Sequence, residues 1–188
     1  MEQVDELRRP EERTRLMYRI VCWVSGITIL TTIVYGIATS AIYASGSIPD
    51  VGASLVNVSF PLPYFAKPVT YLSISSVTFF YTGLRLWQNK VAQWSQARLS
   101  FLQLFAIVVA FASAYEVMYN FMLWGSYFSI QVLYNNLAAN PNFLTSPGPT
   151  PWNLVFATKM FAALFVISAY SVYFLRKIHE VSGLSAVL

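Results

Sequence analysis

The chain has 188 residues, of which 56% are hydrophobic and 11% are charged, and its formal net charge is +4. Because soluble domains carry roughly 25% charged residues, this composition excludes a protein whose whole surface faces water and predicts an all-α integral membrane protein. The single cysteine, Cys22, and the single histidine, His179, exclude a disulfide within the chain and a Cys/His metal cluster, so we expect no cofactor.

The N-terminal residues 1–17 form a polar, highly charged arm that Pro10 divides. Its mixed acidic and basic residues lack the order of a secretory signal, and we expect a short helix or ordered arm at the cytoplasmic surface, with disorder as the alternative. The first membrane span is predicted at about residues 18–44, because no charge occurs between Arg19 and Asp50. Small residues at four-residue intervals on this span predict a ridge for close helix packing; they are Gly36, Ser40 and Ala44.

A proline-rich loop is predicted on the outer side, from Ser45 to Pro68, because its four prolines forbid a long helix. Residues 56–65 are apolar, so we expect them to pack against the helix ends or against a partner. Asn57 begins an Asn-Val-Ser sequon and is therefore a candidate glycosylation site. The second span is predicted at about residues 69–87. Its many hydroxyl groups predict a helix that other helices enclose, with hydroxyls bonded back to its own carbonyls.

The third apolar stretch is unusually long, running for 38 residues from Ser100 to Leu137 with no strong helix breaker except Gly125. As one helix it would measure about 57 Å, against a hydrocarbon core near 30 Å thick. We therefore predict a third span at about residues 100–125, whose helix either extends beyond the outer membrane face or bends near Gly125. A fourth span at about residues 152–175 would complete a four-helix bundle.

The four spans would form one transmembrane domain over residues 18–177, followed by a cytoplasmic tail over residues 178–188. Ten of the twelve basic residues fall on one side if four spans alternate. By the positive-inside rule we predict that both termini are cytoplasmic. We expect the membrane to be the plasma membrane. We expect the lipid bilayer and other membrane subunits as partners, and no nucleic acid. The ten residues are Arg8, Arg9, Arg13, Arg15, Arg19, Arg85, Lys90, Arg98, Arg176 and Lys177.

Two charges lie inside predicted spans. Glu116 is the only charged residue from Leu99 to Thr158, and Lys159 is the next one. A charge in hydrocarbon is costly, so such residues are usually paired, enclosed or functional. At 1.5 Å per residue, Glu116 lies about 24 Å from the cytoplasmic side and Lys159 about 10 Å below the outer face. Both would then lie in the outer leaflet, which predicts an ion pair between the third and fourth spans.

Glu116 shares one helix face with small and polar residues. The spacing predicts that this face packs against neighbouring helices; its other members are Ala106, Ala110, Ser113 and Asn120. Two alternatives remain open. Glu116, with Ser113 and Asn120, could form a proton or cation site, and Lys159 could extend outward separately along its own stem.

No catalytic motif accompanies these residues, since the chain contains no Walker loop, zinc-protease motif, CxxC pair or nucleophile elbow. Catalysis by this chain alone is not predicted, although membership of a membrane enzyme complex is compatible with the sequence. In size and four-span layout the chain resembles small accessory subunits of respiratory or membrane-monooxygenase complexes. A non-catalytic accessory subunit is predicted from three features: the lack of cofactor ligands, the overlong aromatic third helix, and outer loops that are apolar and almost uncharged. The alternative is a small transporter or channel component that uses Glu116.

The outer part of the third helix is rich in aromatic residues. Beyond the bilayer such side chains would be unfavourable in water, so they predict a contact with another protein or with this chain's own outer loops. They are Tyr115, Tyr119, Trp124, Tyr127, Phe128 and Tyr134.

Overall fold

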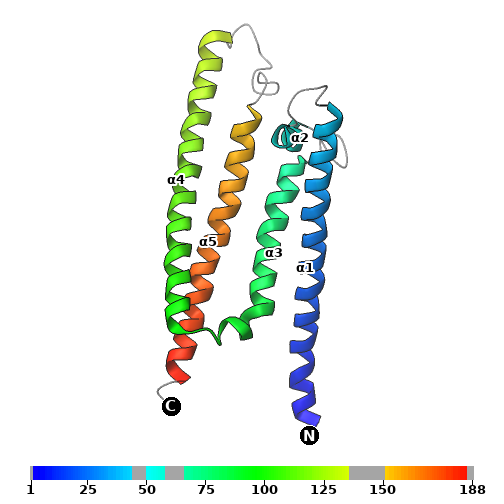
Figure 1. Cartoon of the computed structure of the whole chain (residues 1–188), viewed down its shortest axis with the longest axis vertical. Coiled ribbons are helices and arrows are strands. Elements are labelled where there is room, and N and C mark those ends of the chain that lie inside the picture. Colours follow the sequence, from blue (N-terminus) through cyan, green and yellow to red (C-terminus); the bar gives the residue numbers. More distant parts are fainter. Residues whose placement is uncertain (1, 44–49, 58–65, 136–150, 186–188) are drawn as a thin grey trace.

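The computed structural model describes residues 2–43, 50–57, 66–135 and 151–185, and within this part the chain is helical with no strand. The prediction of an all-α protein is therefore confirmed. The elements in chain order are α1 (Glu2–Tyr43), α2 (Val51–Asn57), α3 (Pro68–Val91), α4 (Gln96–Asn135) and α5 (Trp152–Ser185) (Figure 1).

Three helices are long and apolar enough to cross a membrane. The qualifying segments are Glu12–Ile42 of α1, Gln96–Ile130 of α4 and Trp152–His179 of α5. Within their apolar windows only 17%, 11% and 11% of the residues, respectively, are buried inside the molecule. Most of this apolar surface therefore requires cover from outside the chain, which is consistent with insertion into a membrane.

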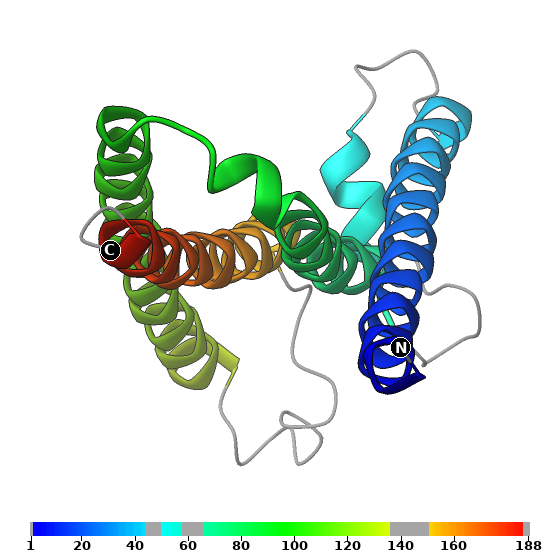
Figure 2. The same ribbon diagram turned by 90° about the horizontal axis from the view of Figure 1, so that it is seen from below.

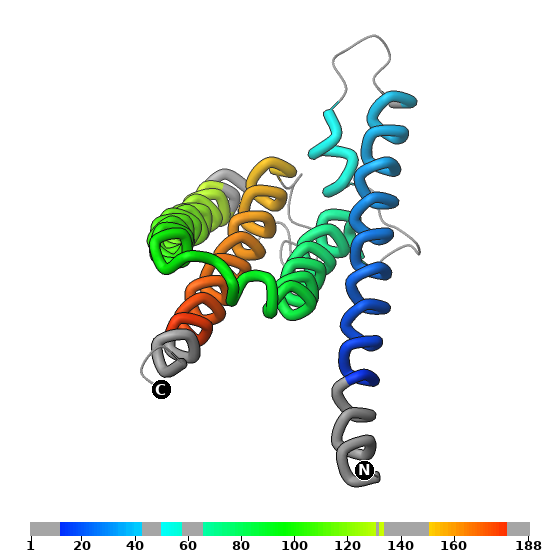
Figure 3. The backbone as a smooth tube through the Cα atoms, turned by 60° about the horizontal axis from the view of Figure 1, so that its bottom comes forward, coloured from blue at the N-terminus to red at the C-terminus, as the bar shows by residue number. Residues whose placement is uncertain are grey.

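The long helices lie in an open row, in the order α4, α5, α3, α1 (Figures 2 and 3). Among the described helices α4 contacts α5 alone, whereas α3 lies between α5 and α1. A closed bundle would bring α4 against α1 or α3, and neither contact occurs among the described helices. The row is more open than the four-helix bundle that the sequence predicts, and the described helices leave much of its two broad faces uncovered, although α2 packs against α1, α3 and α5. The N-terminal end of α1 and the C-terminal end of α5 lie on the same side of the row, at the bottom of Figure 1.

α1 extends without interruption from Glu2 through Pro10 to Tyr43. The boundary expected near residue 17 is therefore not a helix boundary. Glutamate, leucine and arginine, which dominate residues 2–16, are strong helix formers, and they favour continuation of the helix toward the N-terminus.

α4 is one helix of 40 residues that continues through Gly125, so the described backbone has no break there. Its deeply buried residues recur every seven positions, which is the spacing of a narrow seam between two helices. The members are Leu99, Ala106, Ser113 and Asn120. Because α4 contacts α5 alone among the described helices, α5 covers this seam.

α3 contains none of the three segments that are long and apolar enough to cross a membrane. Its hydroxyl groups donate to carbonyls one turn earlier, as predicted: Ser73 to Val69 at 2.8 Å, and Thr82 to Thr78 at 2.8 Å. Contacts with α1, α2 and α5 enclose much of its surface. Enclosure by other helices accounts for its tolerance of so many polar groups.

α2 is a short helix in the loop where the prolines predicted no long one. Its buried residues Leu55 and Val56 pack with Val69 and Leu72 of α3 in an outer core that Trp152 of α5 flanks. The apolar loop thus packs partly against this chain's own helices, while residues 58–65 lie outside the described part. Gly36 lets α1 approach α2 closely, since a Cβ there would lie 2.8 Å from Leu55 Cδ2. Ala44, the last member of the predicted ridge, lies outside the described residues.

Asp50 begins α2 as its N-cap. Its carboxylate accepts a hydrogen bond from Ala53 N at 3.1 Å, and its carbonyl accepts one from Ser54 N at 3.2 Å. We expect Asp50→Ala to lower the free energy of unfolding by about 1 kcal/mol, because one end of α2 loses its cap. Thermal unfolding in detergent, followed by circular dichroism, measures the change. Asp50→Asn is the matched control and should unfold like the unsubstituted protein; an asparagine variant as unstable as the alanine variant would contradict the capping role.

Candidate functional site

The polar face of α4 is directed toward α5. Ser113 and Asn120 are 1% and 4% exposed, while Glu116, between them, is partly exposed. Ser113 Oγ donates to Val109 O within α4. The Asn120 Nδ2 atom is buried and has no hydrogen-bond partner among the described residues. The structure therefore places the predicted residues along one face, with Glu116 at its margin.

The register between α4 and α5 separates Glu116 from Lys159. Trp124 Nε1 of α4 donates to Thr158 Oγ1 of α5 at 3.4 Å, so the two residues lie at one height. Since the helices run in opposite directions, Lys159 lies level with residue 123, which is about seven residues or 10 Å along α4 from Glu116. The assumption of equal depth, on which the predicted ion pair rested, does not match this register.

Lys159 is directed toward α3. Its Nζ atom donates a hydrogen bond to Thr70 Oγ1 at 2.6 Å. The charged side chain that acts electrostatically on Lys159 is that of Lys67, which is also positive. Lys67 Nζ donates to the Asn57 carbonyl at 3.1 Å. Within the described part of the chain no ion pair joins Lys159 to Glu116. Lys159 binds the hydroxyl of Thr70 instead of the predicted carboxylate of Glu116. The three inter-helix segments outside the described part, residues 44–49, 58–65 and 136–150, contain no charged residue.

Asn57, the candidate glycosylation site, is the last residue of α2 and is exposed. The other sequon residues, Val58 and Ser59, lie outside the described part.

A cluster that the sequence analysis did not identify joins α1, α3 and α5. The Tyr81 ring lies 6.2 Å from that of Tyr18 and 4.8 Å from that of Tyr170, between ring centroids. The Arg85 guanidinium carbon lies 5.6 Å from the centroid of the Tyr81 ring, within cation–π range. The four-residue spacing of Tyr81 and Arg85 is visible in the sequence, but the approach of Tyr18 and Tyr170 depends on the order of the helices.

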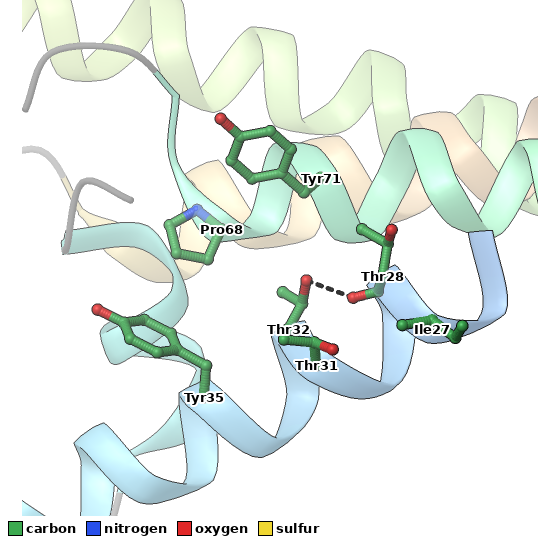
Figure 4. A pocket seen from close by; sticks show the side chains of 7 residues that line it. All are labelled: Ile27, Thr28, Thr31, Thr32, Tyr35, Pro68 and Tyr71. Carbon is green, nitrogen blue, oxygen red and sulfur yellow. Dashed lines mark hydrogen bonds between the residues drawn. The ribbon is translucent and has the colours of Figure 1, made fainter. Parts of the chain in front are cut away.

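Two cavities lie between α1 and α3. One, of about 310 Å³, is lined by apolar groups and hydroxyls, including Thr31, Thr32, Tyr35 and Tyr71 (Figure 4). Thr32 Oγ1 turns back to the carbonyl of Thr28 at 2.7 Å, so this hydroxyl is used within α1. The other cavity, of about 460 Å³, lies near the chain ends and includes two arginines in its lining. Neither lining contains Glu116.

Within the described residues no three His, Cys, Asp or Glu side chains lie together as a metal site would require. Comparisons of the chain with protein-family models, with curated proteins and with solved structures found no match.

Proposed function

We propose that this chain is a non-catalytic accessory subunit of a larger membrane protein complex, for example an assembly of the respiratory or membrane-monooxygenase type. The observation that carries the proposal is the attachment of α4, which contacts only α5 among the described helices and leaves its other faces exposed. Lipid can cover the apolar part of such a surface. A partner subunit would cover the charged Glu116 and the aromatic side chains toward the end of this helix.

The two charged residues in the apolar helices support a partner. Glu116 and Lys159 have no oppositely charged partner among the described side chains, and the connecting segments outside the described part add no charge. An unpaired charge in hydrocarbon is costly, so a residue of opposite charge from another subunit would stabilise each of them.

The length of α4 also supports a partner. Its 40 residues extend about 60 Å, roughly twice the thickness of a hydrocarbon core. If its N-terminal end lies at the cytoplasmic face, its last turns project from the opposite face. Phe128 is 43% exposed, and it stacks with Trp124 with 5.7 Å between ring centroids. A protein surface that covers these rings would account for their abundance.

The proposed topology has four spans, with α3 as the fourth helix that crosses the membrane. If α3 crosses the membrane, the two chain ends lie on the same side of it. This agrees with the structure, in which α1 begins and α5 ends on the same side of the row, and with the clustering of basic residues. That side would be the cytoplasm, and the membrane the plasma membrane. α3 would tolerate lipid less well than its neighbours, and its place between α5 and α1 reduces that exposure.

Purification from native membranes in a mild detergent tests the accessory role. We expect partner chains to remain bound to the tagged full-length chain in a fixed stoichiometry and to co-elute with it in size-exclusion chromatography. Recovery of a stable, monodisperse monomer would contradict the proposal. The same preparation reports whether Asn57 carries a glycan, through a mass shift that a glycosidase removes.

A small transporter or channel component is the second candidate. The observation in its favour is the partly exposed carboxylate of Glu116 at mid-helix, beside the buried amide of Asn120. The linings of the two cavities between α1 and α3 do not include Glu116.

A further inference from the structure

The larger of the two cavities between α1 and α3 lies near the N-terminal part of α1 and the C-terminal part of α3. It measures about 460 Å³, within the range of sites that hold small ligands. Two guanidinium groups, two hydroxyl groups and two amides contribute to its lining, and the lining contains no carboxylate among the described residues. The polar lining residues are Thr14, Arg15, Tyr18, Arg85, Gln88 and Asn89.

Contacts with tyrosine rings position Arg85 in the lining of this cavity. Its guanidinium lies against the ring of Tyr81, which in turn contacts the rings of Tyr18 and Tyr170. The Arg85 Nε atom is buried and has no hydrogen-bond partner among the described residues. The side-chain groups that interact with Arg85 are these same tyrosines, with no carboxylate among them. A guanidinium that lies against tyrosine rings, with no carboxylate beside it among the described residues, has donors available for an anion.

Arg15 adds a second positive charge from the facing helix. It is exposed and lies one turn before the ring of Tyr18 on α1. Two arginines on facing helices, with hydroxyl and amide donors between them, provide the donor set that a phosphate group requires.

We propose that this cavity binds the phosphate group of an anionic phospholipid. A lipid is favoured over a free phosphate because the lining includes the apolar Leu86, and because α1, which lines one side of the cavity, carries the apolar segment Glu12–Ile42 that is long enough to cross a membrane. Basic pockets between helices at the cytoplasmic side of a membrane are a recognised form of lipid site. The proposal requires insertion of α1 and α3 into the membrane, but it does not require the accessory role or any partner subunit.

Lipid binding to the purified full-length chain tests the proposal. Native mass spectrometry of the chain in detergent, with added phosphatidylglycerol or phosphatidylcholine, gives the affinity for each lipid. We expect phosphatidylglycerol to bind at least tenfold more tightly. Arg15→Gln and Arg85→Gln should each weaken its binding about tenfold, because each removes a charge-assisted hydrogen bond to the phosphate.

Matched controls separate this site from general attraction between charges. Arg13→Gln on α1 and Arg98→Gln on α4 remove the same charge at the same end but lie outside the cavity lining, so their binding should change less than twofold. Equal losses in all four variants, or equal binding of both lipids, would overturn the proposal. Inorganic phosphate in millimolar excess should not displace phosphatidylglycerol; full displacement would show a site for free phosphate instead. Arg15→Gln keeps the test decisive if Arg85→Gln fails to fold, because Arg15 is exposed on the surface of α1.

Discussion

Substitution of Gly52 with alanine is expected to destabilise the outer core by about 1–3 kcal/mol, because overpacking of a filled core forces side chains or backbone to move. A Cβ atom on Gly52 would lie 2.4 Å from Trp152 Cζ3, with two further ring atoms within 3.2 Å. The indole ring is rigid and flanks the cluster of Leu55 and Val69, so it cannot withdraw without disturbing that cluster. Thermal unfolding in detergent should show a lower midpoint.

Gly125→Ala is the matched control for this substitution. A Cβ at Gly125 would have no atom within 4 Å, and the position lies inside α4. Alanine there should raise stability by up to about 1 kcal/mol, because it is the better helix former. A Gly52 variant as stable as the unsubstituted protein would contradict the packing of α2 on α5. A strongly destabilised Gly125 variant would contradict a continuous helix at that position.

Lys159→Met and Glu116→Gln are expected to separate stability of the chain from stability of the complex. Lys159 has a hydroxyl but no carboxylate as its described partner, so the neutral methionine should leave unfolding of the isolated chain unchanged within about 1 kcal/mol or slightly improved. In the complex, either substitution would leave a buried charge of a partner subunit unpaired, at a cost of roughly 3–5 kcal/mol. Recovery of partner chains should then fall more than tenfold.

Lys177→Met provides the control on the same helix, since Lys177 is exposed near the end of α5. Its recovery of partners should match that of the unsubstituted protein. Unchanged recovery with Lys159→Met and Glu116→Gln would contradict charge pairing across subunits. If Glu116→Gln instead abolished ion or proton flux in vesicles while partner recovery stayed normal, the transporter or channel function would be supported.

The helices α4 and α5 were predictable because long apolar runs have few other structural solutions in a membrane. α2 was predictable in part: Asp50 carries the N-cap signal, but the neighbouring prolines masked a helix of only seven residues. The order of the helices was not predictable, because a face that packs on lipid and a face that packs on a helix have similar apolar composition.

The relation of Glu116 to Lys159 shows the same limit at the level of two residues. Their depths can be counted from the span ends, but their contact depends on the register between α4 and α5, which the Trp124 and Thr158 pair reveals. The direction of Lys159 likewise depends on the presence of Thr70 on α3, a neighbour that chain order does not reveal. The Arg85 cluster was missed for the same reason, since it draws residues from three helices.

The open row has a consequence for how this chain can change over evolutionary time. In a row, each helix contacts only its neighbours, so the energy of the whole approaches a sum of separate interfaces, as in repeat proteins. The outward face of α4 can therefore accept substitutions without an effect on α1, α2 or α3. Residues on that face can change together with whatever lipid or protein surface contacts them. Residues of α3 are constrained on two sides, because α3 packs between α1 and α5.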